Sequence, residues 1–198
     1  MNLGAQYVLL RNPQEATNTL LKALSFCKKE GDVEGQRTSL HHLTQLSLST
    51  NDHPFAIKYL EEHIELIQAD GNKEEEFKLL TQLTKSCTLI KEYNKAILIG
   101  EQAMELAALS DDKFLHITLL HNLGASYMNI GETEKALKTL ESALGLSHKT
   151  PNSPLQWELI NLISEAAFKA GDVTRTLKVL LNGLEIARKS KDLQNEGA

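Results

Sequence analysis

Apolar residues along this 198-residue chain recur with a period of 40 residues. In the copy from Asp111 to Thr150, Leu120, Leu123 and Tyr127 are spaced i, i+3, i+7, which places them on one face of a helix. A second stripe follows Gly131, at Ala136, Leu137, Leu140, Ala143, Leu144 and Leu146. The pattern predicts two helices of roughly 16 residues, joined by a short turn into an antiparallel hairpin.

The remaining copies keep this register. First helices are predicted over 32–50 and 72–90, and second helices begin near 51, 91, 131 and 171. A fixed period between 20 and 50 residues indicates stacked copies of one unit, none of which buries its apolar face alone. The predicted fold class is all-α, a solenoid of stacked antiparallel hairpins with about five units of 40 residues.

The same register divides the chain into one repeat domain over residues 1–198, with units at approximately 1–30, 31–70, 71–110, 111–150 and 151–190. Residues 191–198 are expected to begin a further unit or form a tail, because Lys191-Asp192 takes the position of Gly31-Asp32. Residues 1–10 match only the later part of a first helix. Both ends are therefore expected to lie inside a unit.

The last second helix has no predicted neighbour on one side. Its apolar residues would be left uncovered, at Leu177, Leu180, Leu181 and Leu184. Solenoids usually carry polar terminal units. The expectation is either a fragment of a longer repeat protein or ends covered by another subunit, which includes self-association through the uncapped terminal helices.

The best copy resembles a known family. Leu123-Gly124-x-x-Tyr127, then Ala136-x-x-x-Leu140 and Ala143, is similar to the tetratricopeptide repeat signature. A second near-complete copy lies near the start of the chain, as Leu3-Gly4-x-x-Tyr7 with Ala16-x-x-x-Leu20 and Ala23. HEAT-type repeats fit the period but not this order of Gly, Tyr and two Ala.

The chain departs from the family pattern in three ways. The period is 40 rather than the usual 34, Leu120 replaces the usual Trp, and the closing Pro is missing. Long repeats of this kind occur in partner-binding scaffolds of the polarity-adaptor and kinesin-light-chain type, and in bacterial peptide-sensing regulators. The resemblance implies a right-handed α-α superhelix.

The small residues of the motif suggest where helices cross closely. Glycine inside a helix costs about 1 kcal/mol, so its use there indicates a packing demand. If the hairpins close as the spacing implies, Gly4 and Gly124 face Ala16 and Ala136.

Composition narrows the class of protein. Aromatic residues make up 5% of the chain and hydrophobic residues 41%, so the core is mostly Leu, Ile and Ala, as helices prefer. The net charge of −5 argues against a nucleic-acid partner. The sequence contains no run of about 18 apolar residues, which a membrane-spanning helix would require. Cys27 and Cys87 fit neither a disulfide framework nor a metal motif, so a reducing, cytoplasmic location is expected.

The first helices carry a second repeating face, which is polar. In tetratricopeptide proteins this face lines the inner groove, so the resemblance implies that it holds an extended peptide or a partner helix. Asn and Gln can pair with a peptide backbone through both donors and acceptors, and Lys can bind a carboxylate. The candidate binding residues are His41, His42, Gln45, Lys78, Gln82, Lys85, His121, Asn122, Asn129, Asn161 and Glu165.

A plainer interpretation stands beside this one, because an amphipathic helix needs a polar face in water regardless of any ligand. The carboxylate clamp of chaperone-tail binders is not predicted. Lys78 and Asn122 could each serve in one, but the accompanying Lys–Arg pair is absent.

No residue pattern indicates catalysis, a metal or a cofactor. His41 and His42 point about 100° apart on a helix, so both cannot easily bind one ion together with His121. Cys87 takes the position of Tyr127 in the core stripe and is expected to be a buried hydrophobe. The sequence has no Gly-rich phosphate loop, nucleophile elbow or zinc motif.

The sequence is compatible with three functions. The first is a non-catalytic scaffold that binds a peptide segment or partner helix in its groove. The second is a sensory or regulatory module of a larger signalling protein, such as a bacterial one. The third is a helical enzyme subunit, whose only candidates, His41, His42, Lys85 and Glu165, lie on separate units. The first is preferred, and the protein is expected not to be an enzyme.

Overall fold

The computed structural model describes residues 12–147 and 154–196. Within these ranges the chain forms helices and no strand. Its elements are α2 (Pro13–Glu30), α3 (Val33–Ser49), α4 (His53–Asp70), α5 (Lys73–Leu89), α6 (Tyr93–Leu106), the 3-10 turn η1 (Ala107–Leu109), α7 (Lys113–Asn129), α8 (Thr133–Ser147), α9 (Pro154–Lys169) and α10 (Val173–Glu196). The Leu3–Tyr7 motif and the partial helix predicted over 1–10 lie outside the described residues.

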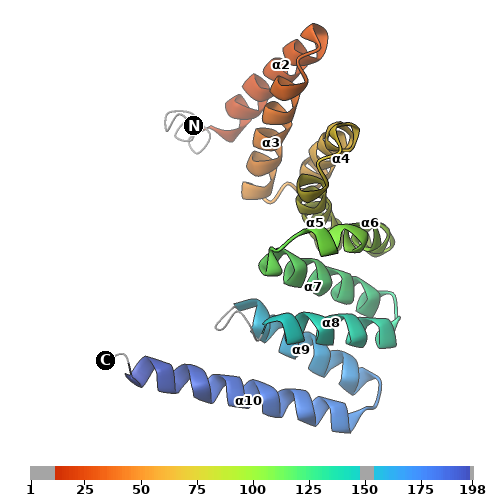
Figure 1. Ribbon diagram of the computed structural model, residues 1–198, viewed down its shortest axis with the longest axis vertical. Helices are drawn as coiled ribbons and strands as arrows, with labels where there is room; N and C mark the ends of the chain where they lie inside the picture. The colour runs from red at the N-terminus through yellow and green to blue at the C-terminus, as the bar shows by residue number, and fades with distance from the viewer. Residues whose placement is uncertain (1–11, 148–153, 197–198) are drawn as a thin grey trace.

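The helices stack as hairpins along the long axis of the molecule (Figure 1). The hairpins are α3 with α4, α5 with α6, α7 with α8 and α9 with α10, and the second helix of each packs on the first helix of the next. In Figure 1, α2 and α3 run obliquely upward, whereas α7, α8 and α10 run nearly horizontally. The hairpins therefore turn along the stack, and the predicted all-α repeat superhelix is confirmed.

The 40-residue register also appears in the backbone. The residue two places before each second helix has a positive φ: 56° at Asn51, 66° at Lys91, 86° at Gly131 and 74° at Gly171. This left-handed conformation ends the first helix and costs a non-glycine residue about 1 kcal/mol. Every hairpin is thus closed by the same backbone turn, whichever side chain stands there.

Side-chain caps begin the first helices. The carboxylate of Asp32 accepts a hydrogen bond from the backbone N–H of Gly35 at 2.9 Å, and Asp112 accepts one from Leu115 at 2.9 Å. Asn72 does the same for Glu75 at 3.2 Å. These caps satisfy backbone donors that the helix itself leaves unpaired, and they explain why the predicted helix starts agree with the structure.

Residues 191–198 are predicted to begin a further unit or to form a tail. The helix break that a further unit would need at Lys191-Asp192 is absent, because α10 continues through both residues to Glu196. The physical reason is the missing stop signal. α2 and α4 end at Gly31 and Gly71, whose φ values are 70° and 77°, whereas Lys191 has no such freedom and a lysine favours continuing the helix.

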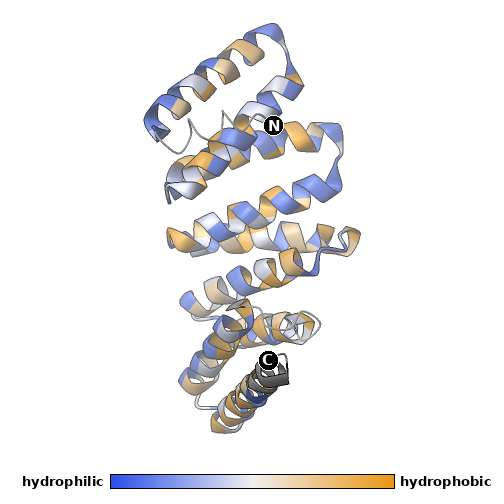
Figure 2. Ribbon diagram, turned by 90° about the vertical axis from the view of Figure 1, so that its left-hand side faces the viewer, coloured by the Kyte–Doolittle hydropathy of each residue, from blue (hydrophilic) through white to orange (hydrophobic). Residues whose placement is uncertain are grey.

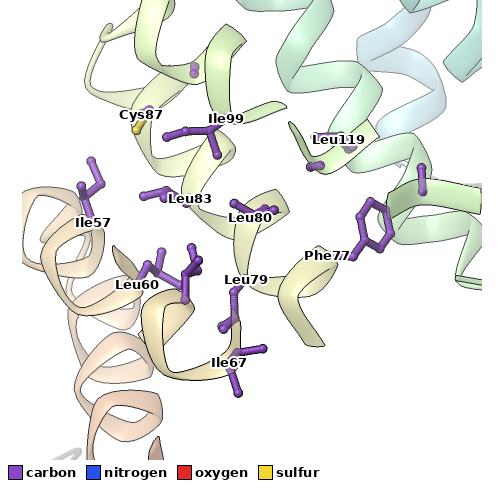
Figure 3. Packing of buried hydrophobic residues seen from close by; sticks show 14 residues of the cluster. Ile57, Leu60, Ile67, Phe77, Leu79, Leu80, Leu83, Cys87, Ile99 and Leu119 are labelled. Atoms are coloured by element: carbon purple, nitrogen blue, oxygen red, sulfur yellow. The ribbon is translucent and has the colours of Figure 1, made fainter. Parts of the chain in front are cut away.

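The core consists of clusters of mostly Leu, Ile and Ala between the hairpins. Figure 3 shows Ile57, Leu60 and Ile67 of α4 beside Leu79, Leu80 and Leu83 of α5, with Leu119 of α7 further along. The predicted stripe residues are buried: Leu40, Leu43, Leu80, Leu83, Leu120, Leu123, Tyr127, Ile160 and Ile163. Each hairpin buries its apolar face only by contact with its neighbours, as in other solenoids.

Cys87 belongs to this core, as predicted. It is fully buried, and burial raises the pKa of its thiol to about 11. Since the thiolate is the reactive form, a thiol with this pKa is inert near neutral pH.

Gly124 packs closely, though not on the expected residue. Ala136 was expected to face it, but a Cβ placed on Gly124 would lie 2.5 Å from Cγ of Leu140, one helical turn further along α8. Ala136 instead packs with Leu123 and Tyr127. The prediction that close packing requires a small residue at 124 is confirmed. The contacting residue is Leu140, because the two helices meet one turn later than the sequence spacing suggested.

The last helix exposes an apolar face. Leu177, Leu180, Leu181 and Leu184 of α10 are 49–59% exposed, as predicted. Elsewhere hydrophobic and hydrophilic positions alternate around each helix (Figure 2), which is typical of helices packed on one side only. None of the described helices is long and apolar enough to cross a bilayer.

Candidate functional site

The polar face of α3, α5, α7 and α9 is the candidate site, and we call it the inner face. It comprises the eleven residues predicted above, and it is built by the helical period: the stripe that packs into the core leaves these positions turned about a quarter-turn away. Seven are exposed: His41, Gln45, Lys78, Lys85, Asn129, Asn161 and Glu165. Three are half-buried, namely His42, Gln82 and His121.

His121 connects three successive first helices electrostatically. Its Nε2 lies 3.4 Å from Oε2 of Glu158 on α9, and Lys85 of α5 acts on it from the other side. Burial lowers the pKa of His121, Glu158 opposes this change, and Lys85 adds to it. The structure therefore brings predicted residues of two units together with Glu158, which was not predicted.

Other inner-face residues are engaged by their own helices. Lys78 pairs with Glu74 at 2.7 Å, and Glu165 pairs with Lys169 at 2.6 Å. The amide of Asn129 donates a hydrogen bond to the carbonyl of Ala125 at 2.8 Å. Exposed pairs of this kind contribute roughly 0–1 kcal/mol and are readily exchanged for a ligand contact.

Asn122 is more buried than the other predicted inner-face residues. It is 6% exposed, and its amide nitrogen donates a hydrogen bond to the carbonyl of Thr118 at 2.7 Å. Its nitrogen is therefore already paired within α7, and Asn122 offers a ligand less surface than the exposed residues of the inner face.

A cavity of about 290 Å³ opens between α3, α4 and α5. It is lined by Glu34, Arg37, Thr38, His41, His42, His63 and Glu75. Two predicted inner-face residues, His41 and His42, thus meet here, their rings edge-on with centroids 5.5 Å apart. The other five lining residues were not predicted.

His63 is the most unusual residue of this cavity. It is 2% exposed, and neither ring nitrogen has a hydrogen-bond partner. Arg37 is anchored by its terminal nitrogens, with Nη2 3.2 Å from Oδ2 of Asp70 and 3.3 Å from the carbonyl oxygen of Leu66. Its Nε is buried and has no partner. Since buried polar groups are nearly always paired, these three nitrogens mark the cavity as chemically distinct.

The repeat register contains a signal that could have revealed both residues. Positions 40 residues apart from His63 hold Ala23, Ala103, Ala143 and Gly183. Positions equivalent to Arg37 hold Phe77, Ile117 and Trp157. The unit at 31–70 therefore places a large polar residue where the others are small, and a charged residue where the others are apolar.

The first helices differ in spacing along the stack. α5 packs directly against α7, whereas α3 and α5 are further apart and meet mainly through α4. The cavity occupies the space that a closer approach of α3 and α5 would fill.

The buried histidines make stability depend on pH. Burial is the main cause of the lowered pKa of His63 and His121, so the unfolded chain, with histidine pKa near 6.5, binds protons that the folded chain does not. We expect the free energy of unfolding to fall as pH drops from 7.5 to 5, because protonation then favours the unfolded state. Urea unfolding at both pH values measures this loss. A smaller loss in His63→Phe is the expected control, and an equal loss in both would contradict the assignment.

In residues 12–147 and 154–196, no group of three or more His, Cys, Asp or Glu side chains is placed to hold a metal ion.

Residues 119–155 match a family model described as tetratricopeptide repeat. The match covers most of α7 and all of α8, and includes the Leu123–Tyr127 motif from which the resemblance was predicted. No curated protein matches the chain.

Solved structures show the same fold over nearly the whole chain. A putative kinesin light chain with nearly identical TPR-like repeats from Podosopora anserina is 19% identical, with a TM-score of 0.73 over 96% of this chain and 93% of that one. A STAND protein (signal transduction ATPase with numerous domains) from Pyrococcus horikoshii, described as having a tetratricopeptide repeat sensor, is 23% identical. It has a TM-score of 0.76 over 98% of this chain and 30% of that one. Aspartyl phosphate phosphatase F from Bacillus subtilis is 17% identical, with a TM-score of 0.73 over 95% and 50%. At these identities the likeness is one of fold.

Proposed function

We propose that this chain, a helical-repeat solenoid with the fold of tetratricopeptide-repeat proteins, is a non-catalytic scaffold that binds an extended peptide or partner helix along its inner face. The observation that carries the proposal is the row formed by Lys85, His121 and Glu158 on α5, α7 and α9. It runs across three units, so a segment lying along it would meet a donor, an adaptable imidazole and an acceptor in turn.

The charge and exposure of the inner face support the same proposal. Exposed amides and charged groups recur on each of its helices, with Gln45 on α3, Lys85 on α5, Asn129 on α7 and Asn161 on α9. Amide side chains can pair with a backbone whatever its sequence, and repetition at one spacing suits an extended ligand. Shape and backbone contacts, rather than a deep pocket, would give the affinity.

The test is binding of peptides from a display library of random dodecapeptides. We expect the double variant Gln82→Ala/Lys85→Ala to bind the selected peptides at least about tenfold more weakly, because two inner-face contacts are removed at once. The matched control is Gln102→Ala/Lys138→Ala, which removes the same two side-chain types from exposed positions on α6 and α8. Affinity is measured by fluorescence anisotropy.

Two results would contradict the proposal. One is a library from which the folded wild-type protein selects nothing. The other is a set of peptides whose affinity falls in Gln102→Ala/Lys138→Ala and not in the inner-face variant, since that would place the binding surface on the second helices.

A regulatory role is the second candidate. It is favoured by the STAND protein, whose repeats are described as a sensor and of which this chain spans 30%. A sensor would change the pitch of its superhelix when peptide binds, whereas a passive scaffold would not. Small-angle X-ray scattering of the free and peptide-bound protein distinguishes the two through a change in maximum dimension.

A further inference from the structure

The cavity between α3, α4 and α5 has its own binding chemistry, set by the three unpaired nitrogens of Arg37 and His63. We propose that this cavity binds an amide group of the peptide held along the inner face. The inference rests on the proposed function and adds to it the chemical class of one ligand group.

Arg37 requires an acceptor and not a charge. Its guanidinium is already compensated, because Nη2 lies 3.2 Å from Asp70 and Nη1 lies 3.8 Å from Glu34. The remaining donor is the buried Nε–H, which has no hydrogen-bond partner in the folded chain. Leaving such a buried donor unpaired is unfavourable, so a neutral oxygen that accepts from it is stabilised there.

His63 requires a donor and an acceptor together. Its burial lowers the pKa of the imidazole, so the ring is neutral at physiological pH. A neutral imidazole has one N–H and one bare nitrogen, and both lack partners here. The groups that face it from the surrounding helices are Glu34, Arg37 and His41 on α3, and Glu75 on α5.

Charged ligand groups fit this lining poorly. An ammonium group has no acceptor for Arg37 Nε. A carboxylate would leave the bare nitrogen of His63 unpaired and would face the carboxylates of Glu34 and Glu75. Neither charged group therefore pairs with both Arg37 Nε and the bare nitrogen of His63.

An amide supplies a partner for each of the two residues. Its carbonyl oxygen accepts from Arg37 Nε, and its own N–H donates to the bare nitrogen of His63. The amide can come from an Asn or Gln side chain or from the peptide backbone. Thr38 and His42 at the same cavity add neutral polar groups, so the lining suits a neutral ligand.

The test uses a positional-scanning library of acetylated, amidated decapeptides and three variants. His63→Phe removes both ring nitrogens, and Arg37→Lys keeps the charge while removing Nε. His116→Phe is the matched control, because this half-buried histidine of α7 also has an unpaired Nε2 but lies outside the cavity, edge-on to Phe77. Thermal melting shows whether each variant is folded. If His63→Phe does not fold, Arg37→Lys alone tests the proposal.

If a side-chain amide is bound, wild type and His116→Phe prefer Asn or Gln over Ala about tenfold at one library position. His63→Phe and Arg37→Lys lose that preference. If the backbone amide is bound, no position shows the preference, and both cavity variants weaken all captured decapeptides about tenfold while the control does not.

The inference is overturned if the cavity variants bind the same peptides as wild type with unchanged affinity. It is also overturned if the preference they abolish is for acidic or basic residues. Failure of wild type to capture any decapeptide is a different result, because it contradicts the proposed function itself.

Discussion

Phe77→Ala is expected to lower the free energy of unfolding by about 4 kcal/mol. Phe77 is fully buried in α5, within the largest cluster of the core, and its ring lies edge-on to His116 of α7 at 5.2 Å between centroids. Truncation removes apolar contacts with two neighbouring hairpins and leaves a cavity that close-packed helices cannot collapse. Urea unfolding followed by circular dichroism measures the loss.

The matched control is Phe114→Ala, the same substitution at a residue of α7 that is 60% exposed. Its expected effect is within about 0.5 kcal/mol, because little apolar area leaves water there. Similar losses for the two variants would contradict the assignment of Phe77 to the interface between hairpins.

Gly124→Leu is expected to cost about 3 kcal/mol, the upper part of the range for overpacking a core. A Cβ at this position would lie 2.5 Å from Leu140 Cγ, which is nearer than two carbons can approach, so α7 and α8 must separate or Leu140 must leave its place. The gain in helix propensity over glycine offsets only about 1 kcal/mol of this cost.

A double-mutant cycle with Leu140→Ala tests that explanation. The double variant is expected to be more stable than the sum of the two single effects predicts by at least about 1 kcal/mol, since a leucine at 124 fills the space vacated at 140. Strict additivity, measured by urea unfolding, would show that Gly124 and Leu140 do not share a contact.

The fold could be predicted because one register governs many residues at once. The positions of Leu120, Leu123 and Tyr127 fixed a helix face, and stop signals such as Gly131 fixed its end. The continuation of α10 through Lys191 could not be predicted from the register alone, because a repeat indicates where a helix can end and not whether the local residue ends it. The residue that contacts Gly124 depends on the point at which α7 and α8 cross. Sequence spacing alone does not fix that point to within one helical turn.

The candidate site could be predicted only in outline. The phase that exposes His41 and Lys85 was visible in the sequence, whereas the burial of Asn122 depends on how far neighbouring helices overlap it. His63 and Arg37 were not predicted, because the candidate residues came from positions that are polar in several repeats. His63 and Arg37 stand at positions that are apolar or small in the other repeats. Their departure from Ala103 and Phe77 in the register is the signal that identifies them.

The central claim is that the inner face of the first helices is the binding surface. The most direct measurement is an NMR titration of the folded protein with a peptide selected from the dodecapeptide library, following backbone amides and histidine ring signals. We predict that shifts concentrate at His41, Gln82, Lys85 and His121 on α3, α5 and α7. Shifts confined to the exposed faces of α4, α6 and α8 would contradict the claim.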